Sequence, residues 1–178
     1  MNGADGSLQA GHLFLYAAPS IIVIPNSQRT PMTSTLFTPR GSLTEIEDGT
    51  SFMPKFDADG LIPVITQDAT SNEVLMFAWM NAEALARTIE TGQAWYWSRS
   101  RESFWRKGDT SGQTQTVRDI RVDCDQDVLV LKVCVGGDGG ACHVGYRSCF
   151  FRSVPTGASD KALTLRIDAA KLSDHKHK

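Results

Sequence analysis

Two apolar runs, Gly60-Leu-Ile-Pro-Val-Ile-Thr-Gln67 and Glu73-Val-Leu-Met-Phe-Ala-Trp-Met80, flank the polar cluster Asp68-Ala-Thr-Ser-Asn72. Both runs are apolar enough for buried strands, and the cluster between them has the composition of a turn. The stretch therefore predicts a β-hairpin at the start of a compact α+β domain.

A short helix and further strands are predicted after this hairpin. Asn81 is suited to cap a helix that runs through Glu90, with apolar residues at helical spacing, and Gly92 is suited to end it. Extended segments are predicted at 93–98, 117–124 and 127–135, a turn at 136–140, two short extended pieces around Gly145, and an edge strand at 163–167. The pattern predicts a small, mostly antiparallel β domain of the α+β class with one or two short helices.

The segments that flank this domain have a different composition. We expect 1–52 to be a flexible N-terminal extension, 53–156 to be the folded domain, and 157–178 to be a polar tail. The apolar run at 12–25 is interrupted by Pro19 and Ser20, so it falls short of the roughly 20 residues of a membrane-spanning helix. The whole chain has 18 Lys and Arg against 20 Asp and Glu, so no bulk positive charge favours nucleic acid or an anionic membrane.

Three cysteines and a histidine form the densest group of potential ligands: Cys124, Cys142, His143 and Cys149. Thiolate sulfur suits Zn²⁺, and three protein ligands that leave a fourth position open are typical of a catalytic zinc site. The alternative is that these cysteines are buried as small apolar side chains. Cys134 is expected to be buried in the core by the alternation of its strand. The alternative is that Cys134 is a fourth zinc ligand, which would make the zinc structural.

Three aspartates surround Cys124 at every second position: Asp123, Asp125 and Asp127, hereafter the acidic triplet. In an extended backbone they would share one face, with Cys124 on the other. Crowded carboxylates favour a hard cation such as Mg²⁺ or Ca²⁺. The alternative is a solvated acidic turn at the end of a strand.

Two stretches with several cations lie between the helix and the cysteines: Ser98-Arg-Ser-Arg101 and Trp105-Arg-Lys-Gly-Asp-Thr-Ser-Gly112. Arginine donates paired hydrogen bonds to phosphate, and glycine lets backbone amides approach an anion. A phosphate-binding loop for a small nucleotide is predicted, with a solvated basic loop as the alternative.

Taken in order, these motifs resemble the phosphoribosyl-AMP cyclohydrolase family, which performs the ring-opening step of histidine biosynthesis. The resemblance runs from about Phe56 to Arg152 and also includes the stretches Gly139-Gly-Ala-Cys-His143 and Arg147-Ser-Cys-Phe150. It departs at Gln113, where the family usually has His or Asn. No counterpart is found for the N-terminal 50 or so residues. The tail is too short for the pyrophosphohydrolase domain fused to some relatives, so a monofunctional enzyme is expected.

The resemblance implies a cytoplasmic hydrolase that acts on a cyclic amidine. In such an enzyme, water activated by zinc would open the N1–C6 bond of 1-(5-phosphoribosyl)-AMP and would give the phosphoribosylformimino-aminoimidazole carboxamide ribotide. It further implies an intertwined homodimer with one Zn²⁺ per subunit, held by Cys124 of one subunit and by Cys142 and Cys149 of the other. Mg²⁺ would bind the acidic triplet.

The remaining roles are inferred from chemistry. His143 is the candidate proton shuttle, because an imidazole with an ordinary pKa near 6.5 exchanges protons at neutral pH. The residues expected to contact the substrate are Arg99, Arg101, Trp105, Arg106, Lys107, Ser111 and Gly112. The rival hypothesis is a non-enzymatic, zinc-stabilised dimer that binds a nucleotide through the same basic loop.

Overall fold

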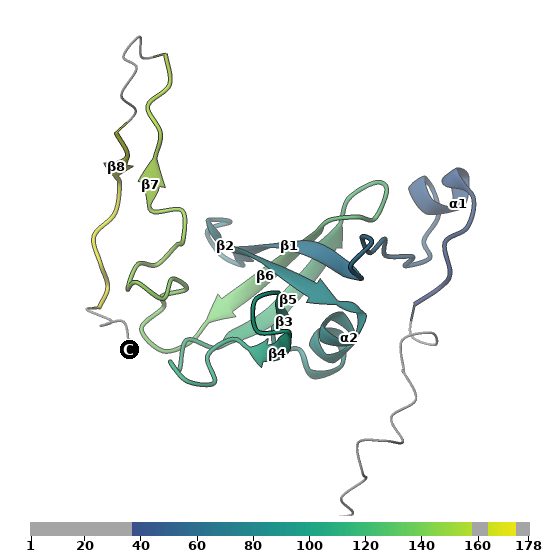
Figure 1. Ribbon diagram of the computed structural model, residues 1–178, viewed down its shortest axis with the longest axis horizontal. Helices are drawn as coiled ribbons and strands as arrows, with labels where there is room; N and C mark the ends of the chain where they lie inside the picture. The colour runs from purple at the N-terminus through teal and green to yellow at the C-terminus, as the bar shows by residue number, and fades with distance from the viewer. Residues whose placement is uncertain (1–36, 158–163, 174–178) are drawn as a thin grey trace, which may run out of the picture. The chain divides into compact units, whose positions relative to one another are not determined.

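The predicted hairpin is present. β1 (Leu61–Asp68) pairs antiparallel with β2 (Val74–Asn81), with Leu61 opposite Asn81. The computed structural model describes residues 37–157 and 164–173, which belong to one compact unit (Figure 1). The hairpin forms the centre of its main sheet.

Four more strands extend the hairpin into a six-stranded mixed sheet of order β4-β3-β2-β1-β6-β5. They are β3 (Trp95–Ser98), β4 (Ser103–Arg106), β5 (Gln115–Val122) and β6 (Leu129–Val135). All pairs are antiparallel except β1 with β6, where Val64 lies beside Leu129 in a parallel ladder. A bridge between Gln93 and Thr116 joins the segment before β3 to β5, so the sheet curls back on itself. The predicted α+β class is confirmed.

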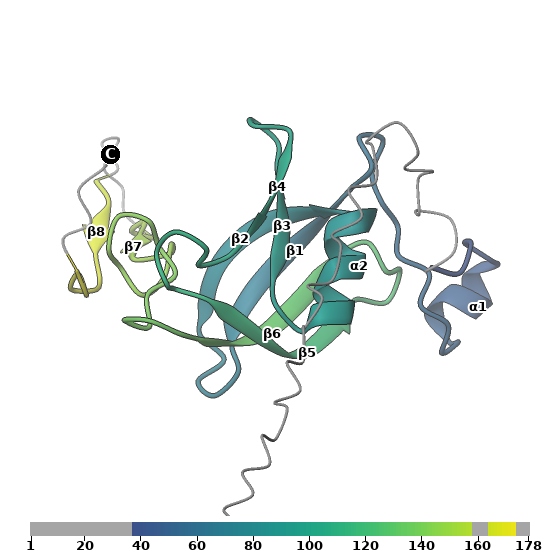
Figure 2. The same ribbon diagram turned by 90° about the horizontal axis from the view of Figure 1, so that it is seen from below.

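The predicted helix is also confirmed, as α2 (Ala82–Thr91). The Asn81 side chain accepts a hydrogen bond from Ala84 N at 2.9 Å, and Gly92 ends the helix with a φ of 65°. A left-handed φ is easy for glycine, which explains the stop. The helix lies against the curled sheet (Figure 2) and buries Ala84, Leu85 and Thr88. Ile89 is one of the apolar residues at helical spacing, but it is 46% exposed.

The core consists of apolar side chains from β1, β2, α2, β3 and β6 around one polar cluster. Within it, the Tyr96 hydroxyl donates to Gln115 Oε1 at 2.7 Å and lies 2.8 Å from Thr66 Oγ1. All three residues have no more than 1% exposure. Their mutual hydrogen bonds remove the cost of burying three polar groups. We call these three residues the core triad.

Residues 37–56 pack on one end of the sheet, next to the β5–β6 connection. This segment contains α1 (Leu43–Glu47), which begins at a capping box formed by Ser42 and Glu45. Ile46 is buried, and Phe37 packs edge-on against Phe52 with 5.6 Å between ring centroids. The first 36 residues of the predicted extension lie outside the described part, and the boundary at residue 52 stays a prediction.

The end of the chain differs from the predicted pattern. The stretch from Cys142 was expected to form two extended pieces, but 141–151 is a series of turns and only β7 (Arg152–Ser153) is extended. β7 pairs with β8 (Arg166–Ile167), which falls within the predicted edge strand. Backbone hydrogen bonds within the loop fold it into turns, from Ala141 N to Arg147 O, Cys142 N to Tyr146 O and Gly145 N to Cys142 O. Among the described residues no helix is long and apolar enough to span a membrane, and the 12–25 run lies outside them.

Candidate functional site

The acidic triplet lies in the β5–β6 turn. β5 ends at Val122 and β6 begins at Leu129, so the prediction that strands include residues 123, 124, 127 and 128 is wrong. Asp123 Oδ1 accepts hydrogen bonds of 3.0 Å from the backbone N–H groups of Asp127 and Val128, which fold the segment into a turn. The carboxylates still meet, with ligand oxygens within 4.8 Å of one another. The turn, and not the alternation of a strand, brings them together.

Gln126 holds this turn against the N-terminal segment. Its side chain accepts from Met53 N at 2.7 Å and donates to Ile46 O and Ser51 O at 3.1 and 3.2 Å. It is 4% exposed and has a φ of 60°, which is uncommon for a residue other than glycine. The buried amide is therefore the anchor of the turn.

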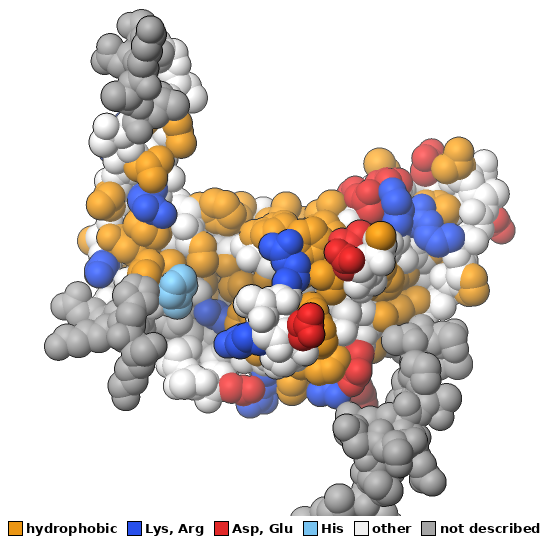
Figure 3. Space-filling model, viewed as in Figure 1, with side chains coloured by type: hydrophobic (Ala, Val, Ile, Leu, Met, Phe, Trp, Pro, Cys, Tyr) orange, Lys and Arg blue, Asp and Glu red, His pale blue; other side chains and the backbone are white. Residues whose placement is uncertain are grey.

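Lys55 provides a cation beside the triplet. Its ammonium lies 3.1 Å from Asp125 Oδ2 and 3.0 Å from Asp127 Oδ2. These contacts, led by the hydrogen bond with Asp127, raise the pKa of Lys55, and the same lysine lowers the pKa of Asp125. Charged side chains of both signs gather at this end of the sheet (Figure 3). Lys55 could not be selected from the sequence, because it lies about 70 residues before the triplet along the chain.

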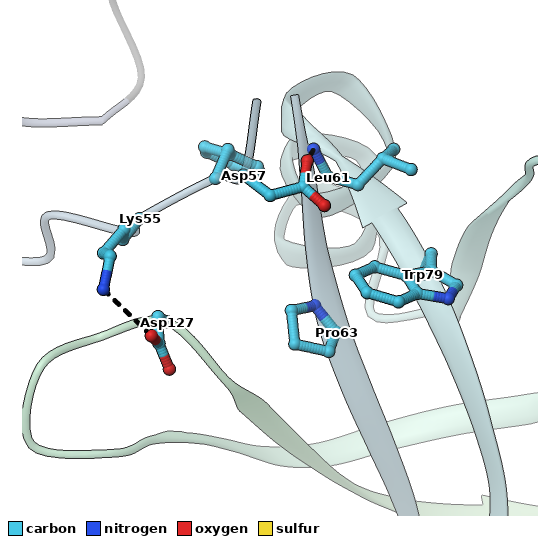
Figure 4. A pocket seen from close by; sticks show the side chains of 7 residues that line it. Lys55, Asp57, Leu61, Pro63, Trp79 and Asp127 are labelled. Atoms are coloured by element: carbon cyan, nitrogen blue, oxygen red, sulfur yellow. Dashed lines mark hydrogen bonds and ion pairs between the residues drawn. The ribbon is translucent and has the colours of Figure 1, made fainter. Parts of the chain in front are cut away.

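A cavity of about 250 Å³ opens beside Asp127. In Figure 4, Pro63 of β1 and Trp79 of β2 face one another across two neighbouring strands, and the Lys55–Asp127 pair lies at one side. Phe56, Asp57 and Leu61 complete the lining. The Arg99 guanidinium lies 4.8 Å from the centroid of the Trp79 ring. The largely apolar walls suit a flat, uncharged group.

Cys142 and Cys149, hereafter the thiol pair, lie together after β6. Their side chains are within hydrogen-bond reach, and burial together with Cys142 raises the pKa of the Cys149 thiol to about 12. All four cysteines of the chain are free thiols. Two adjacent soft ligands fit a thiophilic metal ion such as Zn²⁺.

Lys107 lies beside the thiol pair. Its ammonium donates to Ala141 O at 2.6 Å, so its side chain reaches across to the loop that carries Cys142. Burial lowers the pKa of Lys107, while the two thiols and Asp138 act in the opposite direction. The predicted phosphate ligand is thus placed next to a predicted zinc site.

The loop 141–149 is fixed to the β1–β2 turn by Arg147. This guanidinium is 2.9 Å from Asp68 Oδ2 and 2.8 Å from Glu73 Oε2, and it also donates to Gly139 O at 3.0 Å. Ser148 Oγ donates to Val74 O at 2.7 Å. Arg147 was part of the resembling motif but had no predicted role, because its partners are 74 to 79 residues away in sequence.

Cys124 does not join the thiol pair within one chain. It lies in the turn that precedes β6, whereas the pair follows β6, and in Figure 1 that strand runs from one side of the sheet to the other. A seven-residue strand spans about 20 Å, but two thiolates on one zinc lie within roughly 4 Å. Among the described residues, the acidic triplet is the one group of three or more potential metal ligands that converges.

Cys134 is not in the core, contrary to its prediction. Leu129, Leu131 and Val133 occupy the buried face of β6, so the alternation places Cys134 on the other face. Its sulfur accepts a hydrogen bond from Arg118 Nε at 3.3 Å.

The residues predicted for phosphate binding divide into two groups. Arg99 and Arg101 lie at the turn of the β3–β4 hairpin, which rises from the sheet in Figure 2, whereas Arg106 and Lys107 lie at its other end. β4 between them has four residues and spans about 13 Å. Arg106 pairs with Asp109 at 2.6 Å. One phosphate therefore cannot contact all four cations of a single chain.

The remaining predicted residues have contacts of their own. Trp105 packs on Tyr96 with 4.9 Å between centroids, and Ser111 Oγ accepts from Gln113 N in the loop that contains Gly112. Gln113 is 2% exposed and donates to Asp138 Oδ1 at 2.9 Å. His143 is exposed and directly follows Cys142.

Comparison with known proteins identifies the family. The profile of the family described as Phosphoribosyl-AMP cyclohydrolase matches residues 76–151. A protein of that name from Caulobacter sp. (strain K31) is 56% identical over 125 residues, 70% of this chain and 93% of the relative. The protein of that name from Brucella abortus (strain S19) is 56% identical over 69% of this chain and 88% of its own length. That from Rhodopseudomonas palustris (strain BisB18) is 52% identical over 77% and 92%. With this identity over nearly the whole length of its relatives, the chain belongs to the phosphoribosyl-AMP cyclohydrolase family.

Proposed function

We propose that this protein hydrolyses 1-(5-phosphoribosyl)-AMP, opening the N1–C6 bond of its purine ring to give the carboxamide ribotide intermediate of histidine biosynthesis. The observation that carries the proposal is identity of 52–56% with relatives that bear the name of this activity. The adjacent thiols and the clustered carboxylates are consistent with it, because they provide ligands for one soft and one hard cation.

The zinc ligands in this proposal are Cys142, Cys149 and Cys124 of the partner subunit. The close approach of the thiol pair, and the Lys107 ammonium that offsets its negative charge, support the assignment. When bound there, zinc lowers the pKa of a water molecule to about 7 and so supplies hydroxide at neutral pH. Cys124 lies at the other end of the sheet from the thiol pair of its own chain. The three ligands would therefore meet only in a homodimer. Thiolate ligands also favour a reducing compartment, so we propose a cytoplasmic location.

The chain's own residues would bind the substrate and move the proton. The acidic triplet would hold Mg²⁺, after the Lys55 ammonium is displaced from Asp125 and Asp127. The cavity between Pro63 and Trp79 would accept a flat ring. The cations at the two ends of the β3–β4 hairpin, Arg99 with Arg101 and Arg106 with Lys107, would face different phosphates of the substrate. His143, exposed beside Cys142, would transfer a proton to the departing ring nitrogen.

The activity is tested with purified protein that retains zinc, supplied with phosphoribosyl-AMP and followed by absorbance of the ring-opened product. His143→Ala should reduce kcat by about 10²-fold or more, as expected for loss of a general acid–base group. Normal turnover of this variant from pH 6 to 8 would refute the proton-transfer role. A Cys142→Ser protein that keeps both its zinc and its full activity would refute the metal assignment.

Shared ligands are tested by mixing two inactive variants, Cys124→Ser and Cys142→Ser. In a mixed dimer one of the two sites regains all three thiols, so random assortment should restore about a quarter of wild-type activity. Zero recovery after demonstrated subunit exchange would contradict the shared site. If chelation unfolded the wild-type protein and no hydrolysis were seen, the non-enzymatic zinc-stabilised dimer would be favoured instead.

A further inference from the structure

The C-terminal segment returns to the loop that carries the thiol pair. After Cys149 the chain leaves through β7, comes back through β8, and at Leu172 donates a backbone hydrogen bond of 2.7 Å to Gly145 O. Ser173 N lies 3.4 Å from the same oxygen, and Ser173 Oγ lies 3.1 Å from Asp138 Oδ2. Residues 171–173 thus contact both the 141–149 loop and the turn that precedes it.

A cation–π contact joins the tail to an aromatic stack of the loop. The rings of Tyr146 and Phe151 are stacked with 3.7 Å between centroids and an interplanar angle of 4°. The Lys171 ammonium lies 5.9 Å from the centroid of the Tyr146 ring. Tyr146 is 8% exposed, and its carbonyl accepts from Cys142 N at 3.1 Å. Tyr146 therefore links the tail to Cys142, a predicted zinc ligand.

Burial of its own apolar side chains does not explain why the tail lies here. Leu165, Ile167 and Leu172 are 46%, 61% and 49% exposed. Its described contacts to the folded domain are mainly hydrogen bonds and one cation–π contact, concentrated on 138–151. The loop they contact is made of turns that are closed by a few internal backbone hydrogen bonds, and it belongs to no helix or strand. Such a loop depends on outside contacts to keep two thiols at one fixed separation.

We propose that residues 171–173 form a latch that positions Cys142 and Cys149 for zinc. The latch lies beyond residues 76–151, the part that matches the family profile, and it rests on the proposed zinc site of this enzyme. Its effect is transmitted through Gly145 and Tyr146, so these tail residues are positioning residues and contact neither substrate nor metal.

The test compares two substitutions at one position in the full-length chain. Leu172→Pro removes the backbone N–H that reaches Gly145, whereas Leu172→Ala keeps it and shortens only a half-exposed side chain. Zinc affinity is measured by competition with a chromophoric chelator. Leu172→Pro should bind zinc at least about fivefold more weakly, which corresponds to the net loss of one hydrogen bond, and Leu172→Ala should stay within about twofold of wild type. Ser173→Ala should give a smaller loss in the same direction.

Amide exchange gives a second readout that does not depend on zinc. In metal-free protein, Leu172→Pro should speed exchange at the amides of Cys142 and Gly145, while amides of β1 and β6 stay protected. Equal zinc affinity and equal exchange in Leu172→Pro and wild type would overturn the latch, as would equal losses in Leu172→Pro and Leu172→Ala. If wild-type protein bound no zinc, only the proposed function would be overturned. The exchange experiment in metal-free protein would still show whether residues 171–173 hold the loop.

Discussion

Replacing Gln126 by alanine should loosen the turn that carries the acidic triplet. The substitution removes three side-chain hydrogen bonds, to Met53 N, Ile46 O and Ser51 O, and leaves these buried or half-buried backbone groups without that partner. At about 1 kcal/mol for each bond, the free energy of unfolding should fall by about 3 kcal/mol. For a protein of this size that corresponds to a decrease in Tm of roughly 6–12 °C.

A second substitution separates the hydrogen bonds from the backbone conformation. Gln126→Gly loses the same three bonds, but glycine adopts the observed φ of 60° without the steric cost of about 1 kcal/mol that a side chain incurs. The glycine variant should therefore lie between wild type and the alanine variant. Both variants should need more Mg²⁺ for half-maximal activity, because the carboxylates of the turn are less well held.

The assay is thermal unfolding followed by circular dichroism, with and without Mg²⁺, together with a Mg²⁺ titration of the cyclohydrolase rate. An alanine variant that unfolds at the wild-type temperature would refute the anchoring role of Gln126. If the glycine variant were as unstable as the alanine variant, the argument from positive φ would be wrong.

Three further predictions concern charges near the proposed metal ions. Lys55→Gln should lower the Mg²⁺ concentration for half-maximal activity several-fold, because the ammonium no longer occupies the triplet; an increase would contradict this competition. In metal-free protein the pKa of the Cys149 thiol is raised from 9.0 to about 12. The contribution of this thiol to the stability of the fold is therefore complete below pH 9 and is lost as the pH rises toward 12. Chemical denaturation should show this loss of stability, and the loss should be smaller in Cys149→Ser. Lys107→Met should weaken zinc binding about tenfold at neutral pH in a chelator competition, since no cation then offsets the thiolates; unchanged affinity would show that the lysine serves the substrate only.

Features set by local sequence could be predicted, and the β1–β2 hairpin and α2 are examples. Asn81 and Gly92 act within a few residues of the helix ends they define, so their chemistry is sufficient to place those ends. β4 was not predicted: its last two residues, Trp105 and Arg106, belong to the predicted phosphate-binding loop, because four residues with a charged end carry little strand pattern. Its pairing with β3 determines its conformation.

Features set by contacts distant in sequence could not be predicted. The parallel pairing of β1 with β6 is one example, because no local pattern encodes which strands become neighbours. The turn at the acidic triplet depends on Gln126, which has a left-handed backbone conformation. Glycine is the residue that usually predicts a turn of this kind from sequence, and it does not occur at this position. The alternating aspartates of this stretch therefore suggested a strand. The candidate ligand types could be named from the sequence and stay predictions, whereas their geometry depends on tertiary structure.

The core triad places a constraint on how this sequence can change over evolutionary time. Thr66, Tyr96 and Gln115 belong to three different strands and satisfy one another's hydrogen-bonding groups in a region closed to water. Changing one leaves the others without a partner, at a cost of about 1–3 kcal/mol, whereas replacing all three by apolar residues of similar volume can be nearly neutral. The three positions should therefore covary in sequences of the family. Single replacements should be rare even though none of the three residues belongs to a motif that suggests chemistry.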